Sequence, residues 1–294
     1  MTEPVQHRID TGAARICVHE WGAEHRGARP TLMLSHATGF HGRCWDRVIA
    51  RLGPRHILAP DLRGHGRSSA AAFADWRELG ADLAGVLAAL ELTGVHAVGH
   101  SVGGAATALA ALAAPDRFAR LTLIDPVICP PEIYAQGVNP MAAPEGELHP
   151  IARRKARFAS LDDMQAQLGA RPPYALFDPR VMQDYCRFGT AEEAGERVLL
   201  CAPEFEASVY QSALVFAGIH AAMADLRPPT LVVRAQRPRR PEDWRDFRFS
   251  PTDPALAAHL PRGRDLYLPQ FTHFIPQQSP DFCAGMILAG EAVL

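Results

Sequence analysis

The sequence predicts an α/β fold, with a mostly parallel, doubly wound sheet and a helical segment inserted after its sixth strand. Three observations favour this class. Short apolar runs alternate with helical patterns over the first 126 residues, the alternation stops from about 127 to 226, and it resumes towards the end. Strands that alternate with helices indicate right-handed crossovers and a parallel sheet. A chain of 294 residues is long enough for one large core.

The predicted strands differ in how apolar they are. The later ones are continuously apolar, as expected for parallel strands that are covered on both faces. The earliest ones, before residue 30, could pair antiparallel at one edge of the sheet. The predicted strands are 14–21, 30–37, 56–61, 95–101, 121–126, 229–235 and 264–270.

Helical patterns lie between these strands. Segments 42–52 and 76–92 are predicted helices, and a last helix is predicted over 279–290. In the second segment, leucines and a valine recur at helical spacing, so that one face is apolar. These residues are Leu79, Leu83, Val86, Leu87 and Leu90.

The interruption predicts a cap. It opens with a Pro- and Gly-rich stretch over 129–150 and continues with predicted helices over 151–159 and 203–226. We therefore predict a core formed by 1–126 and 227–294, and a helical cap formed by 127–226.

Composition excludes several classes of protein. The net charge is −2 and the basic residues are scattered, which argues against nucleic acid or an anionic membrane as the main partner. Six cysteines show no CxxC or metal-ligand spacing, and the N-terminus has no apolar signal core, so free thiols and a cytoplasmic location are expected. No run of about 18 apolar residues is present to span a membrane.

A serine lies between two glycines in Gly99-His100-Ser101-Val102-Gly103. This G-x-S-x-G pattern follows a predicted strand and precedes a helix, which is the context of a nucleophile on a sharp turn. The turn strains the backbone and brings neighbouring segments close, so a side chain at 99 or 103 would clash. Ser101 is the predicted nucleophile, and the N–H of Val102 is a predicted oxyanion donor.

A serine hydroxyl needs a base and a second oxyanion donor. His273 lies in a loop after the last predicted strand and before the last helix, and is the predicted base. The backbone N–H of Thr38, after the strand at 30–37, is the predicted second donor. His36 is predicted to shape this loop rather than to act as a base.

Several motifs together resemble the large capped family of α/β-hydrolases. They extend from about residue 30 to 285: HATGF (36–40), DLRGHGRSS (61–69), VGHSVGG (98–104), LTLIDP (121–126), PTLVVRA (229–235) and THF (272–274). The resemblance implies a sheet of the α/β-hydrolase type. We predict that Asp61, Arg63 and His65 in the second motif stabilise a loop and take no part in catalysis.

The acid departs from the family pattern. The family usually places an Asp a few residues after PTLVVR. In this chain Gln236, Arg237 and Pro238 occupy that region, and the first acids beyond it are Glu242 and Asp243. Some members place the acid after the sixth strand instead, where Asp125 stands. Chain order in this fold is Ser, acid, His, which either choice satisfies. We predict Asp125, with Asp243 as the alternative.

A serine nucleophile predicts acyl chemistry through an acyl-enzyme, on a small to medium, largely apolar ester, thioester or lactone. The resemblance implies that dehalogenation or epoxide opening in this fold would call for Asp at position 101. The alternatives are acyl transfer to an alcohol, C–C bond hydrolysis, cofactor-free peroxidase chemistry and a catalytically silent small-molecule receptor. No metal or organic cofactor is implied, and the oligomeric state stays open. Cap aromatics that could line the pocket are Phe177, Tyr185, Tyr210 and Phe216.

Overall fold

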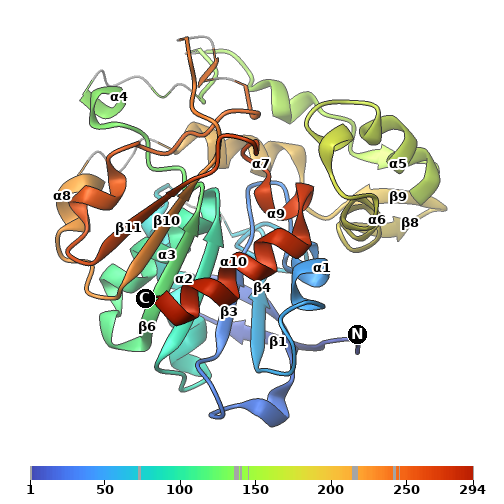
Figure 1. Cartoon of the computed structure of the whole chain (residues 1–294). Helices are drawn as coiled ribbons and strands as arrows, with labels where there is room; N and C mark the ends of the chain where they lie inside the picture. Colours follow the sequence, from blue (N-terminus) through green and yellow to red (C-terminus); the bar gives the residue numbers. More distant parts are fainter. Residues whose placement is uncertain are drawn as a thin grey trace.

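An eight-stranded sheet forms the centre of the computed structural model, which describes residues 2–71, 74–135, 139, 141–144, 146–213, 218–240, 243–244 and 246–293. Its strand order is β1-β2-β4-β3-β5-β6-β10-β11 (Figure 1). β2 pairs antiparallel with β1 and β4, and the other neighbours pair parallel, which confirms the predicted fold class. The strands are β1 Val5–Asp10, β2 Arg15–Trp21, β3 Leu32–Ser35, β4 Ile57–Pro60, β5 Val95–His100, β6 Phe118–Ile124, β10 Thr230–Arg234 and β11 Gly263–Tyr267.

The sheet edge shows what the sequence pattern missed. β1 was not predicted, because an edge strand is half in water and its residues VQHRID are mostly polar and exposed. The antiparallel pairing expected for the earliest strands is present between β1 and β2. The central strands β3 and β5 are buried at every position, as their continuous apolar runs predicted.

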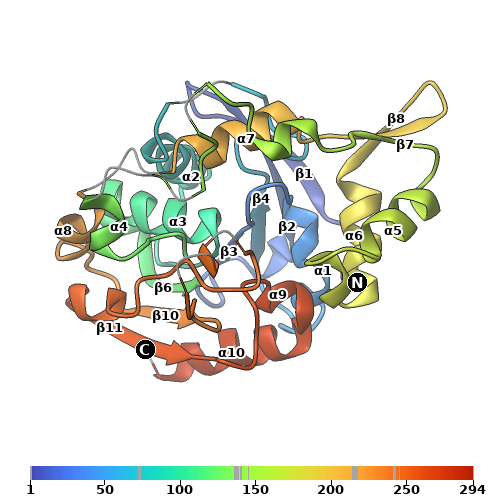
Figure 2. The same ribbon diagram turned by 90° about the horizontal axis from the view of Figure 1, so that it is seen from above.

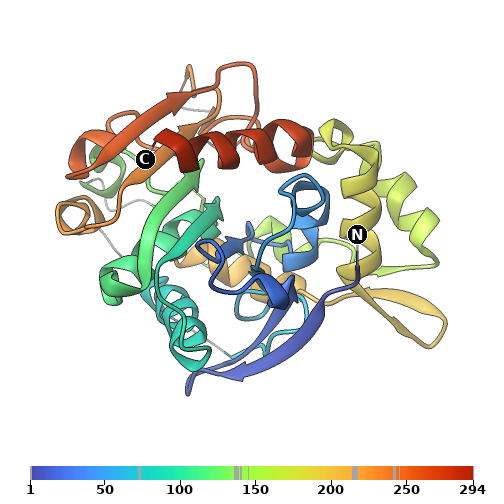
Figure 3. The same cartoon turned by 60° about the horizontal axis from the view of Figure 1, so that its bottom comes forward.

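Helices cover both faces of the sheet. α2 and α3 pack on one face, and α1 and α10 on the other (Figures 2 and 3). Neighbouring strand residues alternate between the two layers: Leu123 packs with α2 and α3, and Ile124 packs with α10. The predicted helix 42–52 is instead a 3₁₀ turn, Gly42–Trp45, followed by one short helix. The helices are α1 Asp46–Ile49, α2 Arg77–Ala89, α3 Val102–Ala113, α9 Ile275–Gln278 and α10 Pro280–Val293.

The segment between β6 and β10 adds no strand to the large sheet in its described part. Much of it lies above the sheet in Figure 1, and its last helix, α8, lies beside β11. It is not purely helical, contrary to our prediction, because it holds a three-stranded antiparallel sheet in the order β7-β9-β8. Its elements are α4 Pro131–Ala135, β7 Arg157–Phe158, α5 Leu161–Gly169, α6 Pro179–Phe188, β8 Thr190–Glu193, β9 Glu196–Leu199, α7 Pro203–Gln211 and α8 Ile219–Met223.

A two-residue turn explains the unexpected hairpin. Ala194 and Gly195 have φ angles of 51° and 83°, and they join the paired residues Glu193 and Glu196. Two consecutive positive φ angles match the right-handed twist of a hairpin. The predicted helix 151–159 is replaced by a 3₁₀ turn at Pro150–Arg153 and by β7. The boundaries of the predicted cap, 127–226, stay a prediction.

In the described part of the chain, no helix combines the length and the apolar character that crossing a bilayer requires.

Candidate active site

Ser101 stands on a strained turn between β5 and α3. Its φ and ψ are 59° and −125°, a region that non-glycine residues rarely occupy and that costs about 1–3 kcal/mol. The flanking glycines are required by close approaches. A Cβ on Gly99 would lie 2.3 Å from the Gly103 carbonyl oxygen, and one on Gly103 would lie 2.4 Å from the His36 carbonyl oxygen. The turn therefore holds Ser101 in one fixed place at the carboxyl end of β5.

Three side chains from distant parts of the chain meet at this turn. Ser101 Oγ lies 2.9 Å from His273 Nε2, and His273 Nδ1 lies 2.6 Å from Asp125 Oδ2. His273 is in the loop between β11 and α9, and Asp125 directly follows β6. The exposed fractions of Ser101, His273 and Asp125 are 6%, 4% and 0%. This arrangement lets the imidazole take a proton from the hydroxyl while the carboxylate fixes its tautomer.

The other oxygen of Asp125 is held by the neighbouring strand and a loop. Oδ1 accepts hydrogen bonds from the Ala235 N–H at 2.9 Å and the Ser250 hydroxyl at 2.5 Å, with the Thr252 hydroxyl at 3.5 Å. Asp125 itself has a φ of 45°. The carboxylate is therefore oriented by bonds that leave only Oδ2 for His273.

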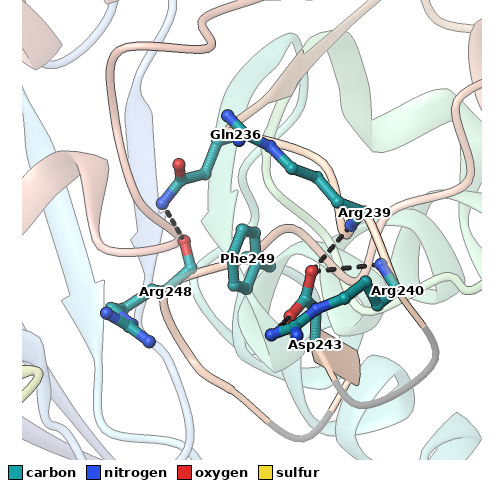
Figure 4. A pocket seen from close by; sticks show the side chains of 6 residues that line it. All are labelled: Gln236, Arg239, Arg240, Asp243, Arg248 and Phe249. Atoms are coloured by element: carbon teal, nitrogen blue, oxygen red, sulfur yellow. Dashed lines mark hydrogen bonds and ion pairs between the residues drawn. The ribbon is translucent and has the colours of Figure 1, made fainter.

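The alternative acid, Asp243, does not contact His273. Its carboxylate accepts the N–H groups of Arg239 and Arg240, at 2.8 and 3.1 Å, and stabilises its own loop (Figure 4). Those bonds, first the one from Arg239, lower the pKa of Asp243. Gln236, at the usual family position, points its amide nitrogen at the Arg248 carbonyl, 3.0 Å away (Figure 4). Glu242 lies outside the described residues.

The two predicted oxyanion donors come from the residue after Ser101 and from the segment after β3. Val102 is the first residue of α3 and is fully buried, and Thr38 follows β3 and is 7% exposed. Thr38 and Ser101 line the same cavity. Within the described ranges, neither N–H donates to a protein acceptor, although buried amide groups are normally paired. Among the described residues, both groups therefore have an unused N–H, as an oxyanion donor requires.

Histidines near the site act as structural groups. His36 donates from Nδ1 to the Ala37 carbonyl and accepts the Leu62 N–H at Nε2, and burial lowers its pKa to about 3. His100 donates from Nε2 to the carbonyl of His273 at 2.7 Å, so it fixes the backbone of the base. The sequence analysis missed this role of His100, since it occupies a variable position of the G-x-S-x-G pattern.

Polar side chains stabilise the loop after β4, as the sequence predicted. Asp61 accepts the N–H groups of Gly42 and Arg67, and Arg63 forms an ion pair with Asp82. His65 donates to the carbonyl of Arg63. Each of these side chains therefore stabilises the loop.

A cavity of about 460 Å³ opens beside Ser101 and His273. Its wall is mainly apolar, with Trp76, Tyr174 and Phe274 among its residues, and the inserted segment adds Glu206. Burial raises the pKa of Glu206, which also pairs with Arg154 at 2.5 Å. The cavity wall is thus mainly apolar, with His149 and Asp246 as further polar side chains beside Glu206.

The cap aromatics divide into two groups. Tyr210 lines the cavity as predicted. Phe177 and Tyr185, which we also expected there, are absent from its wall and pack with Phe40 in a buried cluster. Large aromatics gain most from full burial, so packing takes precedence here. Phe216 lies outside the described residues.

Comparison with known proteins finds chains that are similar to this one in sequence and in fold. A family model described as "Alpha/beta hydrolase family" matches residues 32–285. Lipase LipV of Mycobacterium tuberculosis is 43% identical over 100 residues, 33% of this chain but only 37% of that protein. The putative carbamate hydrolase RutD of Azorhizobium caulinodans is 28% identical over 215 residues, 72% of this chain and 75% of that protein. The solved structure of E-2-(acetamidomethylene)succinate hydrolase shares the fold, with a TM-score of 0.75, 19% identity and coverage of 97% and 98% of the two chains.

Proposed function

The chain belongs to the alpha/beta hydrolase family, and from that premise we propose that it is a serine hydrolase that cleaves a carboxylic ester, thioester or lactone through an acyl-enzyme on Ser101. One observation carries the proposal. The contacts from Ser101 to His273 and from His273 to Asp125, at 2.9 and 2.6 Å, end at a cavity that can hold a small molecule.

The first half-reaction follows from these contacts. His273 Nε2 takes the Oγ proton as Ser101 attacks the acyl carbon, and Asp125 stabilises the imidazolium that forms. The N–H groups of Val102 and Thr38 bind the oxyanion of the tetrahedral intermediate. When the intermediate collapses, the bond to the leaving group breaks and His273 returns the proton to it. The acyl group then remains on Ser101.

Water completes the cycle. His273 takes a proton from a water molecule as the oxygen attacks the acyl carbon, and gives that proton to Ser101 Oγ when the acid is released. We propose water as the acceptor because His273 can activate it without a dedicated alcohol site. An alcohol entering the same cavity would make the protein an acyltransferase instead.

The cavity supports a small to medium, largely apolar acyl group. Its wall is mainly apolar, and its 460 Å³ lies within the range of small-molecule pockets. A series of nitrophenyl esters from acetate to decanoate tests this: kcat/KM is expected to peak at a short or medium chain. A preference for charged or very long acyl groups would contradict the substrate class.

Labelling with a fluorophosphonate tests the nucleophile without knowledge of the substrate. We expect one adduct on Ser101, found by intact mass and peptide mapping, and no adduct in Ser101→Ala or His273→Ala. Asp243→Asn serves as the control that should label normally. Folded wild-type protein that takes no label would refute an acyl-enzyme and favour a silent receptor. The receptor hypothesis rests on the absence of an acid directly after β10. The contact between Asp125 and His273 argues against it, because Asp125 can take the place of that acid.

A further inference from the structure

A second cluster of polar side chains lies away from the Ser101 cavity. His220 on α8 and His259 in the 3₁₀ turn Leu256–His259 both face Asp253. His220 Nε2 lies 3.1 Å from Asp253 Oδ2, and His259 Nε2 lies 3.6 Å from the same oxygen. None of the three lines the cavity beside Ser101. Figures 1 and 2 place α8 at the same edge of the molecule as β11.

The bonding of Asp253 leaves one oxygen for the two rings. Oδ1 accepts the N–H of Ala255, whereas Oδ2 faces only His220 and His259 among the described residues. The ring of His220 is also fixed by an edge contact with Tyr134, at 5.7 Å between centroids. Two imidazole nitrogens and one carboxylate oxygen therefore lie within 4.8 Å of one another.

The other cluster of this kind in the described ranges differs. Cys17, His19 and Asp61 lie equally close together, but they are buried and Asp61 already accepts two backbone N–H groups. Its carboxylate is fully used in holding the loop after β4. The cluster around Asp253 instead reaches the surface, since the side chain of His259 is 37% exposed. An ion could enter there.

We propose that His220, Asp253 and His259 bind one divalent transition-metal ion, with Zn²⁺ as the best fit. Zn²⁺ bonds of about 2.1 Å in a tetrahedron place ligand atoms about 3.4 Å apart. The distances from Asp253 Oδ2 to His220 Nε2 and His259 Nε2, 3.1 and 3.6 Å, bracket that value. Two imidazoles and one carboxylate are a common zinc donor set, and water would fill the fourth position. No sequence motif indicated this site, because 33 residues separate His220 from Asp253.

The ion would join α8 to the loop that positions the acid. Asp253 donates its N–H to the Ile128 carbonyl, and Ser250 and Thr252 in the same loop contact Asp125. Binding would therefore link the last described helix of the inserted segment to the sheet edge next to the site. This inference does not depend on the proposed hydrolase activity.

Titration of metal-free protein with Co²⁺, followed by displacement with Zn²⁺, tests the site. We expect one Co²⁺ per chain, with the intense visible bands of four-coordinate cobalt, and loss of these bands on adding Zn²⁺. His259→Ala, at an exposed position, should weaken Co²⁺ binding by more than about 100-fold. His25→Ala is the matched control, because His25 lies 3.6 Å from Glu24 and belongs to neither three-residue cluster.

Three results would overturn the proposal. They are the absence of saturable binding to wild-type protein, full binding by the His259→Ala variant, and a near-ultraviolet thiolate-to-cobalt band, which would assign the ion to Cys17. Thermal unfolding gives a second readout. Zn²⁺ should raise the Tm of wild type and of His25→Ala but not that of His259→Ala. Circular dichroism checks that each variant is folded before binding is compared.

Discussion

β6 and β10 are neighbours in the sheet, yet the carboxylates that follow these two strands make different contacts. Asp125, after β6, directs one oxygen to His273, while Asp243, beyond β10, uses its carboxylate for two N–H groups of its own loop. Both side chains are buried. Burial and residue type therefore do not distinguish an acid that orients a histidine from one that stabilises a loop, and the hydrogen-bond partners do.

Strand register explains how the acid can stand on either strand. β6 and β10 are parallel neighbours, with Ile124 opposite Val233, so both end at the same edge. Asp125 donates its N–H to the Val233 carbonyl and accepts the Ala235 N–H at Oδ1. Its carboxylate thus lies beside the end of β10, close to where an acid on that strand would project.

Replacing each of the two acids by its amide should give the largest difference in activity between the two strand ends. Asp125→Asn should lower kcat by about 10³–10⁴-fold, because an amide cannot hold the imidazole tautomer or stabilise the imidazolium. Asp243→Asn should leave kcat close to wild type. Steady-state kinetics on the best nitrophenyl ester measures both. If Asp243→Asn lost activity by orders of magnitude while Asp125→Asn kept it, the acid would have been assigned to the wrong strand.

Acid stability should separate the buried histidines around the site from Asp243. At the ends of β3 and β5, burial lowers the pKa of His36 to about 3 and holds the pKa of His100 well below its usual value. Below about pH 6.5 the unfolded chain binds protons at these positions and the folded chain does not, so stability is complete above pH 6.5 and is lost as the pH falls. For His36 the loss is roughly 2 kcal/mol by pH 5.

Urea unfolding at pH 7 and pH 5 measures that loss. His36→Asn should unfold with a shallower pH dependence, by about one proton. Asp243 affects stability in a lower pH range. Because its pKa is lowered, its contribution to the free energy of unfolding is lost only as the pH falls through about 3.8 and below. Equal pH dependence in wild type and His36→Asn would show that His36 is protonated in the folded protein.

The loop that supports Asp125 gives a smaller effect. Ser250→Ala removes a 2.5 Å hydrogen bond to Oδ1, leaving the bond from Ala235 and a longer contact from Thr252. We expect kcat to fall by about 10-fold, since an orienting partner of an active-site group is lost. KM should not change, because Ser250 does not line the cavity. Thr252→Val is the matched control and should have less effect on kcat, as its hydroxyl donates mainly to the Pro126 carbonyl at 2.7 Å.

The sequence predicted the parts of the molecule that follow local rules. The apolar strands, the glycine-flanked turn at Ser101 and the place of His273 after the last strand each depend on a few neighbouring residues. Hairpin β8–β9 was missed because its turn, Ala194-Gly195, lacks the usual asparagine or aspartate. A helix or strand is identified in a sequence by its hydrophobic periodicity, and short strands in a polar segment show no such periodicity.

The features that the sequence did not predict depend on contacts between residues far apart in the chain. The sequence left Asp125 and Asp243 as alternatives, since the distance from either to His273 is set by register and loop path. It also gave no role to His100 or Ser250, whose partners are 173 and 125 residues away. Phe177 and Tyr185 were expected in the cavity because a helix aromatic looks the same in sequence whether it packs inward or lines a pocket.

The smallest expected effect is at Gln236, the position where the family usually has its acid. Its amide donates to the Arg248 carbonyl, so Gln236→Ala should reduce the free energy of unfolding by about 1 kcal/mol through the lost bond. Turnover should stay close to wild type, because no described contact joins this side chain to Asp125 or His273. Urea unfolding and kcat measured on the same preparation separate the two effects. A fall in kcat as large as that of Ser250→Ala would mean that the loop after β10 also helps to orient Asp125. The hydrogen bonds in the structure instead attribute this orientation to the end of β10 at Ala235 and to residues 250–252.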